Sequence, residues 1–137
     1  MDINVEEFTS PIEVTVGPEA SIDEALKLME KNQIRHLPVL NNQEVVGIVS
    51  ERDLLTHFGK GWSGSLKVKD IMNPSILTVS AQDSLGEVAF RLSSEKKGSA
   101  LVLDEEGKIF GIFTTTDALN ALVEMQFPES AKTKPSV

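Results

Sequence analysis

The 137-residue sequence contains no cysteine and only two histidines. Without cysteine the chain has no disulfide, no thiolate nucleophile and no cysteine-ligated zinc. Two separated histidines leave few nitrogen ligands for a metal ion. We therefore expect neither thiol chemistry nor a metal cofactor.

Long apolar runs and a surplus of basic residues are also missing. No apolar run approaches the ~18 residues that a membrane-spanning helix needs. The opening residues, MDINVEEF, are acidic, whereas a signal peptide begins with basic residues. The formal net charge of −8 disfavours nucleic-acid binding, which needs a concentrated basic surface. These features predict a cytoplasmic protein with no membrane or nucleic-acid partner.

Composition and length fit one ordinary globular protein, with 40% hydrophobic and 25% charged residues. The two halves repeat each other. PIEVTV, residues 11–16, aligns with PSILTV, residues 74–79, at an offset of 63 (79 − 16). HLPVL, residues 36–40, aligns with SALVL, residues 99–103, and from Gly47 and Gly111 onward the offset is 64. An internal repeat of this length predicts two copies of one structural unit.

Each copy contains one clearly amphipathic helix. Apolar residues recur at i, i+3, i+4 and i+7 in both copies, at Ile22, Ala25, Leu26 and Met29 and at Leu85, Val88, Ala89 and Leu92. Capping boxes mark the helix starts, Ser21 with Glu24 and Ser84 with Glu87. We predict a helix after each of these serines.

The rest of each copy reads as strands and a second helix. Polar turns at residues 41–44 and 104–108 separate apolar runs, which is typical of hairpins. The pattern predicts a mixed α/β (α+β) protein made of two β-α-β-β-α repeats related by pseudo-twofold symmetry, with the sheets packed together and the helices outside. One copy alone would bury too little surface to be stable, so the two are expected to share a core.

The predicted boundaries follow the repeats. We place the first repeat at 1–60, a glycine-rich linker at 61–69, the second repeat at 70–126 and a disordered polar tail at 127–137. Trp62 lies in the linker, where we expect it to cover the joint; stacking on a ligand is the alternative.

One short motif occurs twice, as IVSERDLL at residues 48–55 and IFTTTDAL at 112–119. Ser50 with Asp53, and Thr114 with Asp117, have the spacing of a helix cap. A helix start is also an anion site, and a nearby carboxylate can accept two hydrogen bonds from a ribose diol. The spacing alone leaves both interpretations open.

No catalytic group of residues emerges from the sequence. It has no nucleophile paired with a base, no phosphate-binding glycine loop and no pair of carboxylates flanking a substrate slot. His57 is expected at the C-terminal end of a helix, where its charge suits the helix dipole, rather than acting as a base. We predict that the protein is not an enzyme.

The sequence resembles the cystathionine-β-synthase (CBS) domain pair, often called a Bateman module. The resemblance covers roughly Ser10 to Met125 and depends on IRHLPVL followed by VVGIVSERDLL, on GSALVLDEEGKIFGIFTTTDAL, and on VKDIMNP before the second repeat. Leu101 departs from the pattern, because Pro38 stands at the equivalent position of the first repeat.

The resemblance implies a ligand site in each repeat. It assigns phosphate contacts to Ser50, Arg52, Thr114 and Thr116, and ribose contacts to Asp53 and Asp117. It implies an adenine slot at Val45, Val46 and Ile109, and basic contacts to phosphate from Arg35 and His36. Ser99 stands at the position of His36 in the second repeat, so we expect weaker phosphate binding there.

The implied function is a regulatory sensor that binds an adenosine compound, AMP, ADP, ATP or S-adenosylmethionine, and changes conformation. No other cofactor is required. The resemblance also implies a homodimer and an unidentified downstream protein partner. The alternative is a structural dimerisation or scaffolding module in which the motif residues only cap helices.

Overall fold

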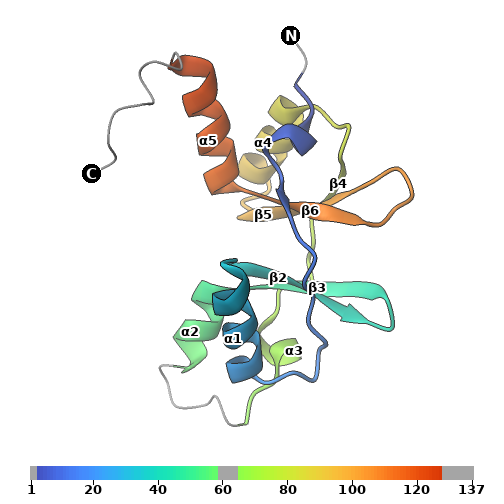
Figure 1. The fold of residues 1–137 in the computed structure, drawn as a ribbon, viewed down its shortest axis with the longest axis vertical. Helices are drawn as coiled ribbons and strands as arrows, with labels where there is room; N and C mark the ends of the chain where they lie inside the picture. The colour runs from blue at the N-terminus through green and yellow to red at the C-terminus, as the bar shows by residue number, and fades with distance from the viewer. Residues whose placement is uncertain (1–2, 59–64, 128–137) are drawn as a thin grey trace. The chain divides into compact units, whose positions relative to one another are not determined.

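The computed structural model describes residues 3–58 and 65–127, which form two compact units (Figure 1). The first unit spans residues 12–76, and the second combines residues 1–11 with residues 77–137. Residues 61–64 of the predicted linker, which include Trp62, and the tail from Pro128 onward lie outside the described residues.

The first unit contains α1 (Ile22–Asn32), β2 (His36–Asn41), β3 (Glu44–Ser50), α2 (Glu51–Phe58) and α3 (Val68–Ile71). Strands β2 and β3 form an antiparallel hairpin, and Val16 forms a parallel bridge to Val39. Asn42 and Gln43 both have positive φ, at 51° and 72°, which suits the two-residue hairpin turn. The core contains nine buried residues, Val16, Ile22, Ala25, Met29, Leu37, Val39, Val49, Leu54 and Val68.

The second unit contains η1 (Val5–Phe8), β1 (Ser10–Pro11), β4 (Thr78–Ser80), α4 (Leu85–Ser94), β5 (Ser99–Leu103), β6 (Ile109–Thr114) and α5 (Thr115–Gln126). Its sheet has the order β1-β6-β5-β4, with β4 parallel to β5 and the other pairs antiparallel. Its core contains Val5, Leu77, Val79, Ala81, Leu85, Val88, Leu92, Ala100, Val102, Phe113 and Ala121.

The mixed α+β fold class and the two repeats are confirmed, but the expected shared core is not found, because the buried residues form a separate core in each unit. The order β4-α4-β5-β6-α5 is the predicted β-α-β-β-α unit. The cap at Ser21 also forms as predicted, with the Glu24 N–H donating to the serine hydroxyl at 3.0 Å. At Ser84 the hydroxyl accepts the Glu87 N–H at 3.5 Å.

The first strand of the first repeat differs from the prediction, because it is reduced to the bridge at Val16. In the second repeat the Leu101 N–H donates to the Leu77 carbonyl, and the Ala81 N–H donates to the Leu103 carbonyl, each at 2.8 Å. The positions equivalent to Leu101 and Ala81 in the first repeat are Pro38 and Pro18 (101 − 63 and 81 − 63). Proline has no N–H, so neither hydrogen bond can form in the first repeat.

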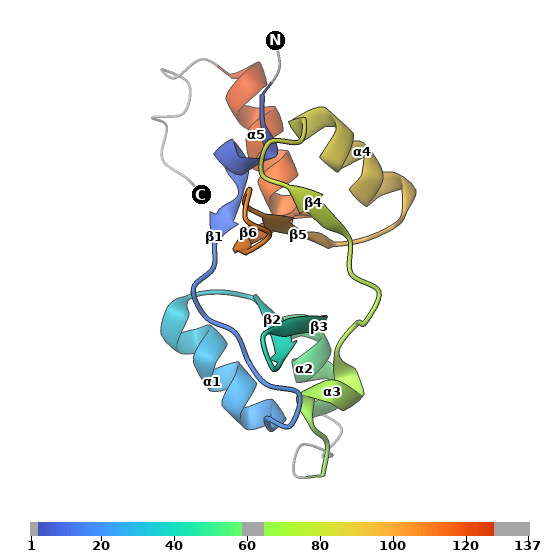
Figure 2. The same cartoon turned by 90° about the vertical axis from the view of Figure 1, so that its right-hand side faces the viewer.

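The segments that precede the two repeats are exchanged between the units (Figure 2). Residues 5–11 precede the first repeat but pack in the second unit, whereas residues 68–74 precede the second repeat but pack in the first unit. Val5 and Val68, the first residues of these segments, are both fully buried. The predicted boundaries at residues 60 and 70 follow the chain and therefore differ from the compact units.

Two glycines accommodate the exchanged segments. A Cβ atom on Gly47 of β3 would lie 2.6 Å from the Met72 Sδ, and one on Gly111 of β6 would overlap the backbone carbonyl oxygen of Ser10. The exchanged segments therefore approach β3 and β6 closely. Every helix within the described ranges falls short of the length and apolarity that crossing a bilayer demands.

Candidate functional site

The motif of the first repeat lies where β3 runs directly into α2. The Ser50 hydroxyl accepts the backbone N–H of Asp53 at 3.1 Å, which is the bond expected of a helix cap. The N–H of Glu51 donates to the carbonyl of Arg35 at 2.8 Å, which fixes the start of β2 beside the start of α2. Ser50 thus has the predicted capping role.

The carboxylate of Asp53 has no such role. The side chain is exposed, and among residues 3–58 and 65–127 its carboxylate oxygens accept no hydrogen bond and form no ion pair. Capping therefore accounts for Ser50 but not for the acidic side chain three residues later.

The motif of the second repeat is fully engaged within its own unit. Asp117 Oδ2 accepts hydrogen bonds from the Thr114 N–H at 2.9 Å and from the Thr114 hydroxyl at 3.1 Å. The Asp117 N–H in turn donates to the Thr114 hydroxyl at 3.2 Å, which completes a capping box. The Ser10 hydroxyl donates to Asp117 Oδ1 at 3.4 Å, so both oxygens of this carboxylate have a partner.

Three basic residues gather around the motif of the first repeat. His36 is half-buried and lies directly opposite Ser50 in the β2–β3 ladder. Arg35 precedes it, and Arg52 lies exposed on the first turn of α2. The structure thus brings together five predicted site residues, Arg35, His36, Ser50, Arg52 and Asp53.

The second repeat has the same backbone arrangement without the basic side chains. Ser99 lies opposite Thr114 in the β5–β6 ladder, and the Thr115 N–H donates to the Gly98 carbonyl at 3.2 Å. Thr116 is exposed on the first turn of α5. This end of the hairpin is therefore less favourable for phosphate.

The predicted adenine contacts lie at the other ends of the strands. Val45 is five residues before Ser50 on β3, roughly 16 Å along an extended strand, and Ile109 is five residues before Thr114 on β6. Val46 packs against the core of the first unit, whereas Val45 and Ile109 are half-buried outside both cores. Within each unit the predicted apolar and polar contacts are therefore separated.

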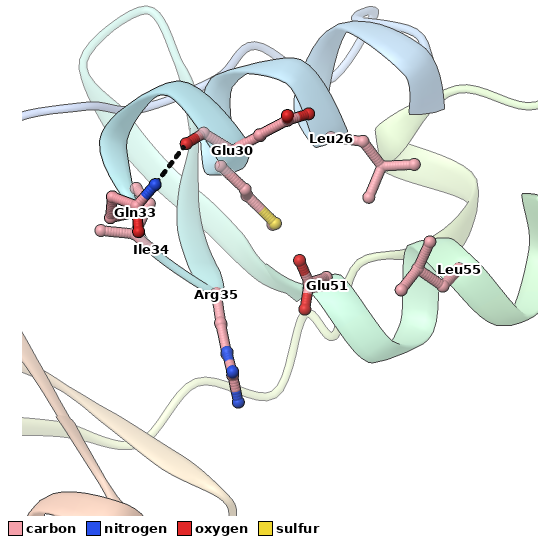
Figure 3. A pocket seen from close by; sticks show the side chains of 8 residues that line it. Leu26, Glu30, Gln33, Ile34, Arg35, Glu51 and Leu55 are labelled. Carbon is pink, nitrogen blue, oxygen red and sulfur yellow. Dashed lines mark hydrogen bonds between the residues drawn. The ribbon is translucent and has the colours of Figure 1, made fainter.

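A pocket of about 530 Å³ opens between α1 and α2 in the first unit (Figure 3). The pocket is lined by four apolar residues, Leu26, Met29, Ile34 and Leu55, and by four polar or charged residues, Glu30, Gln33, Arg35 and Glu51. Arg35 is the only predicted site residue among them, and its guanidinium points away from Glu30. Two carboxylates at this pocket disfavour phosphate, so it does not replace the site at Ser50.

The sequence analysis did not identify two residues close to these motifs, Ser10 and Asn73. The alignment of the halves extends upstream, because Ser10 and Asn73 also differ by 63 positions. Ser10 pairs with Ile112 and its hydroxyl reaches Asp117, whereas Asn73 pairs with Ile48 and its side-chain Oδ1 accepts the Ser75 N–H at 2.9 Å. The alignment of the halves could have identified these two residues as equivalent. It gave no sign that each of their segments packs in the unit of the other repeat.

The fold and sequence match known proteins. CBSX2 of Arabidopsis thaliana, in a crystal structure with AMP, is 32% identical with a TM-score of 0.69, and the match covers 90% of this chain and 98% of that one. The CBS domain pair of protein MJ0100, in complex with 5′-methylthioadenosine and S-adenosylmethionine, has 23% identity and a TM-score of 0.80, covering 92% of this chain and 100% of that one.

The first curated relatives are longer than this chain. An inosine-5′-monophosphate dehydrogenase of Korarchaeum cryptofilum is 36% identical over 104 residues, a match that covers 76% of this chain but 21% of the enzyme. The chain spans less than half the length of each of the first curated relatives it matches. The dehydrogenase match is thus confined to a small part of that enzyme.

The family model for the CBS domain matches the chain twice, at residues 5–60 and 68–124. These two matches cover most of the sequence and coincide with the internal repeat. The chain therefore belongs to the CBS domain family and carries two CBS domains in tandem.

Proposed function

We propose that the protein is a regulatory sensor that binds an adenosine compound at the Ser50–Asp53 turn of the first repeat. One observation carries this proposal: the Asp53 carboxylate is open, whereas the equivalent carboxylate of Asp117 has partners on both oxygens. The AMP complex of CBSX2, a relative at 32% identity, supports adenosine chemistry and makes AMP the first ligand to test.

In this proposal, different residues contact the ribose and the phosphate of the ligand. Asp53 accepts hydrogen bonds from the two ribose hydroxyls, in the bidentate manner that suits a carboxylate. The start of α2 at Ser50 and the guanidinium of Arg52 hold phosphate, because the helix dipole and a cationic side chain both favour an anion there. Arg35 adds positive charge at the same end of the hairpin, and His36 adds an imidazole next to it.

The remaining predicted contacts are weaker candidates. Val45 in the first repeat and Ile109 in the second have half-buried apolar side chains outside both cores, as an adenine contact requires. Val46 packs against the core of the first unit, so it is less available to contact adenine. In the second repeat, Ser99, Thr114, Thr116 and Asp117 form a site with less positive charge, which we expect to bind weakly or not at all.

The sensor acts by binding rather than by catalysis. A ligand can shift a conformational equilibrium only if its affinity differs between the two states, so AMP must favour one conformation of the chain. We propose that this change is read by a protein partner, that two copies of the chain form a homodimer, and that the protein works in the cytoplasm without an enzymatic activity of its own.

The proposal is tested with a thermal-shift panel of AMP, ADP, ATP and S-adenosylmethionine, with GTP as the control for the base. Saturation at 100 times the dissociation constant stabilises the folded state by about 2.7 kcal/mol, which raises the melting temperature by a few degrees. We expect a shift with at least one adenosine compound that is lost in Asp53→Ala and also in Asp53→Asn. Asparagine is a good cap but lacks the charged acceptor.

The alternative function predicts a different result. If no compound shifts the melting temperature of the wild type, the Asp53 carboxylate has no ligand role, and Ser50, Thr114 and Asp117 act only as helix caps. The protein would then be a structural dimerisation module.

A further inference from the structure

The pocket between α1 and α2 has apolar walls that the proposed adenosine site does not use. Its volume of about 530 Å³ lies within the range of small-molecule sites. Leu26 on α1 and Leu55 on α2 face each other across it (Figure 3), and Met29, which is buried in the core of the first unit, also lines it. The pocket can therefore enclose the apolar part of a small organic molecule.

Each of the two helices also contributes one carboxylate to the pocket. Glu30 follows Leu26 by four residues on α1. Glu51 precedes Leu55 by four residues on α2. Four residues are about one helical turn, or about 6 Å along the axis, so side chains at this spacing lie on one face of a helix. The two leucines thus form an apolar part of the pocket, and the two glutamates form an acidic part beside it.

Neither of these carboxylates accepts a hydrogen bond or forms an ion pair within residues 3–58 and 65–127. The Gln33 side chain donates to the backbone carbonyl of Glu30 at 3.3 Å (Figure 3). Among the described residues that line the pocket, Arg35 alone is cationic, and its guanidinium points away from Glu30. Glu51 is half-buried, so its carboxylate loses part of its hydration without gaining a partner. The pocket therefore favours a positively charged ligand.

The second repeat does not have this acidic character. Ser93 and Thr115 stand at the positions of the two glutamates (30 + 63 and 51 + 64). Lys96 and Lys97 stand at the positions of two neutral residues that line the pocket (33 + 63 and 34 + 63). These equivalent positions in the second repeat would repel a cation. The pair of open carboxylates is thus a property of the first repeat and not of the repeated pattern.

We propose that this pocket binds a small organic amine, in which a primary ammonium group is attached to an apolar body. An ammonium group has three N–H donors, enough for both carboxylates, and the apolar body contacts Leu26, Met29 and Leu55. A metal ion fits less well, because hard cations need six or more oxygen ligands, and the described part of the chain contains no cluster of three metal-ligating side chains. Neither Ser50 nor Asp53 lines the pocket, so this site is separate from the proposed adenosine site.

A lysine side chain of another protein carries the same ammonium group. Its stem is an unbranched chain of about four carbons, which would leave most of the apolar wall without a contact. A free amine with a bulkier apolar body fits the pocket better. The volume and the apolar walls therefore favour a small molecule over a lysine side chain.

Phenylbutylamine is the probe for this site, because it is protonated at pH 7 and carries an aromatic ring on an alkyl chain. The sequence has four methionines, so NMR of methyl-labelled methionine gives few signals, and the Met29 signal reports on the pocket. We expect the Met29 signal to shift during the titration, with a dissociation constant of ~1 mM or lower. The signal of Met125, which is on α5 in the other unit, should not move.

The second repeat supplies the matched variants. Glu51→Thr should weaken binding of phenylbutylamine at least about tenfold, as loss of a hydrogen bond to a charged group does. Glu51→Gln should weaken it similarly and keeps the size of the side chain. Glu30→Ser should weaken it about threefold, because Glu30 is more exposed. Glu44→Gln removes a negative charge on β3 outside the pocket and should leave the dissociation constant within about twofold of the wild type.

Two further compounds test the two parts of the ligand separately. Phenylbutanol has a hydroxyl in place of the ammonium and should bind at least about tenfold more weakly than phenylbutylamine. Methylamine has the ammonium without the apolar body and should leave the Met29 signal unmoved at the same concentration. Equal binding of phenylbutanol would overturn the role of the carboxylates, and equal binding of methylamine would overturn the role of the apolar walls.

The site itself can also be refuted. An unmoved Met29 signal at ~10 mM phenylbutylamine would overturn it, because small-molecule sites are occupied well below that concentration. Wild-type affinity in Glu51→Thr and Glu51→Gln, with both variants folded by circular dichroism, would also overturn it. Tighter binding of a capped lysine amide than of phenylbutylamine would overturn the assignment to a small amine in favour of a protein side chain. None of these outcomes depends on whether an adenosine compound binds.

Discussion

The two repeats carry the same hydroxyl and carboxylate at the same helix start, yet the carboxylates differ in their surroundings. In the second repeat Asp117 accepts hydrogen bonds from Thr114 and Ser10. In the first repeat Asp53 is exposed, and Asn73, the counterpart of Ser10, uses its side chain in a local turn. An identical spacing can therefore place the carboxylate in a helix cap in one copy and leave it exposed in the other.

The strand ladders of the two repeats differ for a related reason. Leu101 and Ala81 donate the hydrogen bonds that flank β4, whereas Pro38 and Pro18 stand at the equivalent positions and cannot donate. A substitution that removes a backbone donor thus changes the length of a strand without changing the order of elements.

The largest expected effect is at the glycines where the exchanged segments approach the sheets. Gly111→Ala forces the backbone of Ser10 away from β6, so we expect the free energy of unfolding to fall by about 3 kcal/mol, as overpacking does. Gly47→Ala meets mainly the flexible side chain of Met72 and should cost about 1 kcal/mol. Urea unfolding measures both changes in the free energy of unfolding. Equal losses for the two variants would contradict a closer approach of the exchanged segment to β6 than to β3.

A smaller effect is expected from making the second repeat resemble the first. Leu101→Pro removes both the side chain and the N–H that reaches the Leu77 carbonyl, whereas Leu101→Ala removes most of the side chain alone. We expect the proline variant to be less stable than the alanine variant by about 2 kcal/mol, because a buried carbonyl loses its donor. Equal stability of the two variants in urea would show that this hydrogen bond does not account for the longer ladder.

Most of the fold could be predicted from the sequence because the signals are local and occur twice. The capping box at Ser21 and the hairpin turn at Asn42 each depend on a few neighbouring residues. The exchange of residues 5–11 and 68–74 could not be predicted, because both segments have the same pattern and either unit offers a buried position for their first valine. Pro18 and Pro38 explain why the first strand of the first repeat is reduced to a bridge. That explanation required the structure, which shows that their counterparts Ala81 and Leu101 donate backbone hydrogen bonds.

The sequence predicted which residues lie near the two helix starts, but not which of their side chains already have hydrogen-bond partners. The sequence analysis identified Asp53 and Asp117 as equivalents, and spacing alone could not distinguish a capping carboxylate from an open one. That difference depends on side-chain geometry at each helix start and on Ser10, which is 107 residues from Asp117 along the chain. The separation of Val45 from Ser50 along β3 likewise became visible only in the structure.

The most direct measurement is a paired comparison of Asp53→Ala and Asp117→Ala, with AMP affinity by calorimetry and stability by urea unfolding for each. We predict that Asp53→Ala weakens AMP at least tenfold, about 1.4 kcal/mol, and changes stability by less than about 0.5 kcal/mol. Asp117→Ala should lose about 1 kcal/mol of stability, because it removes a cap, and should keep its AMP affinity within about twofold. The reverse pattern, with AMP binding lost in Asp117→Ala and retained in Asp53→Ala, would contradict the assignment of the ligand site to the first repeat.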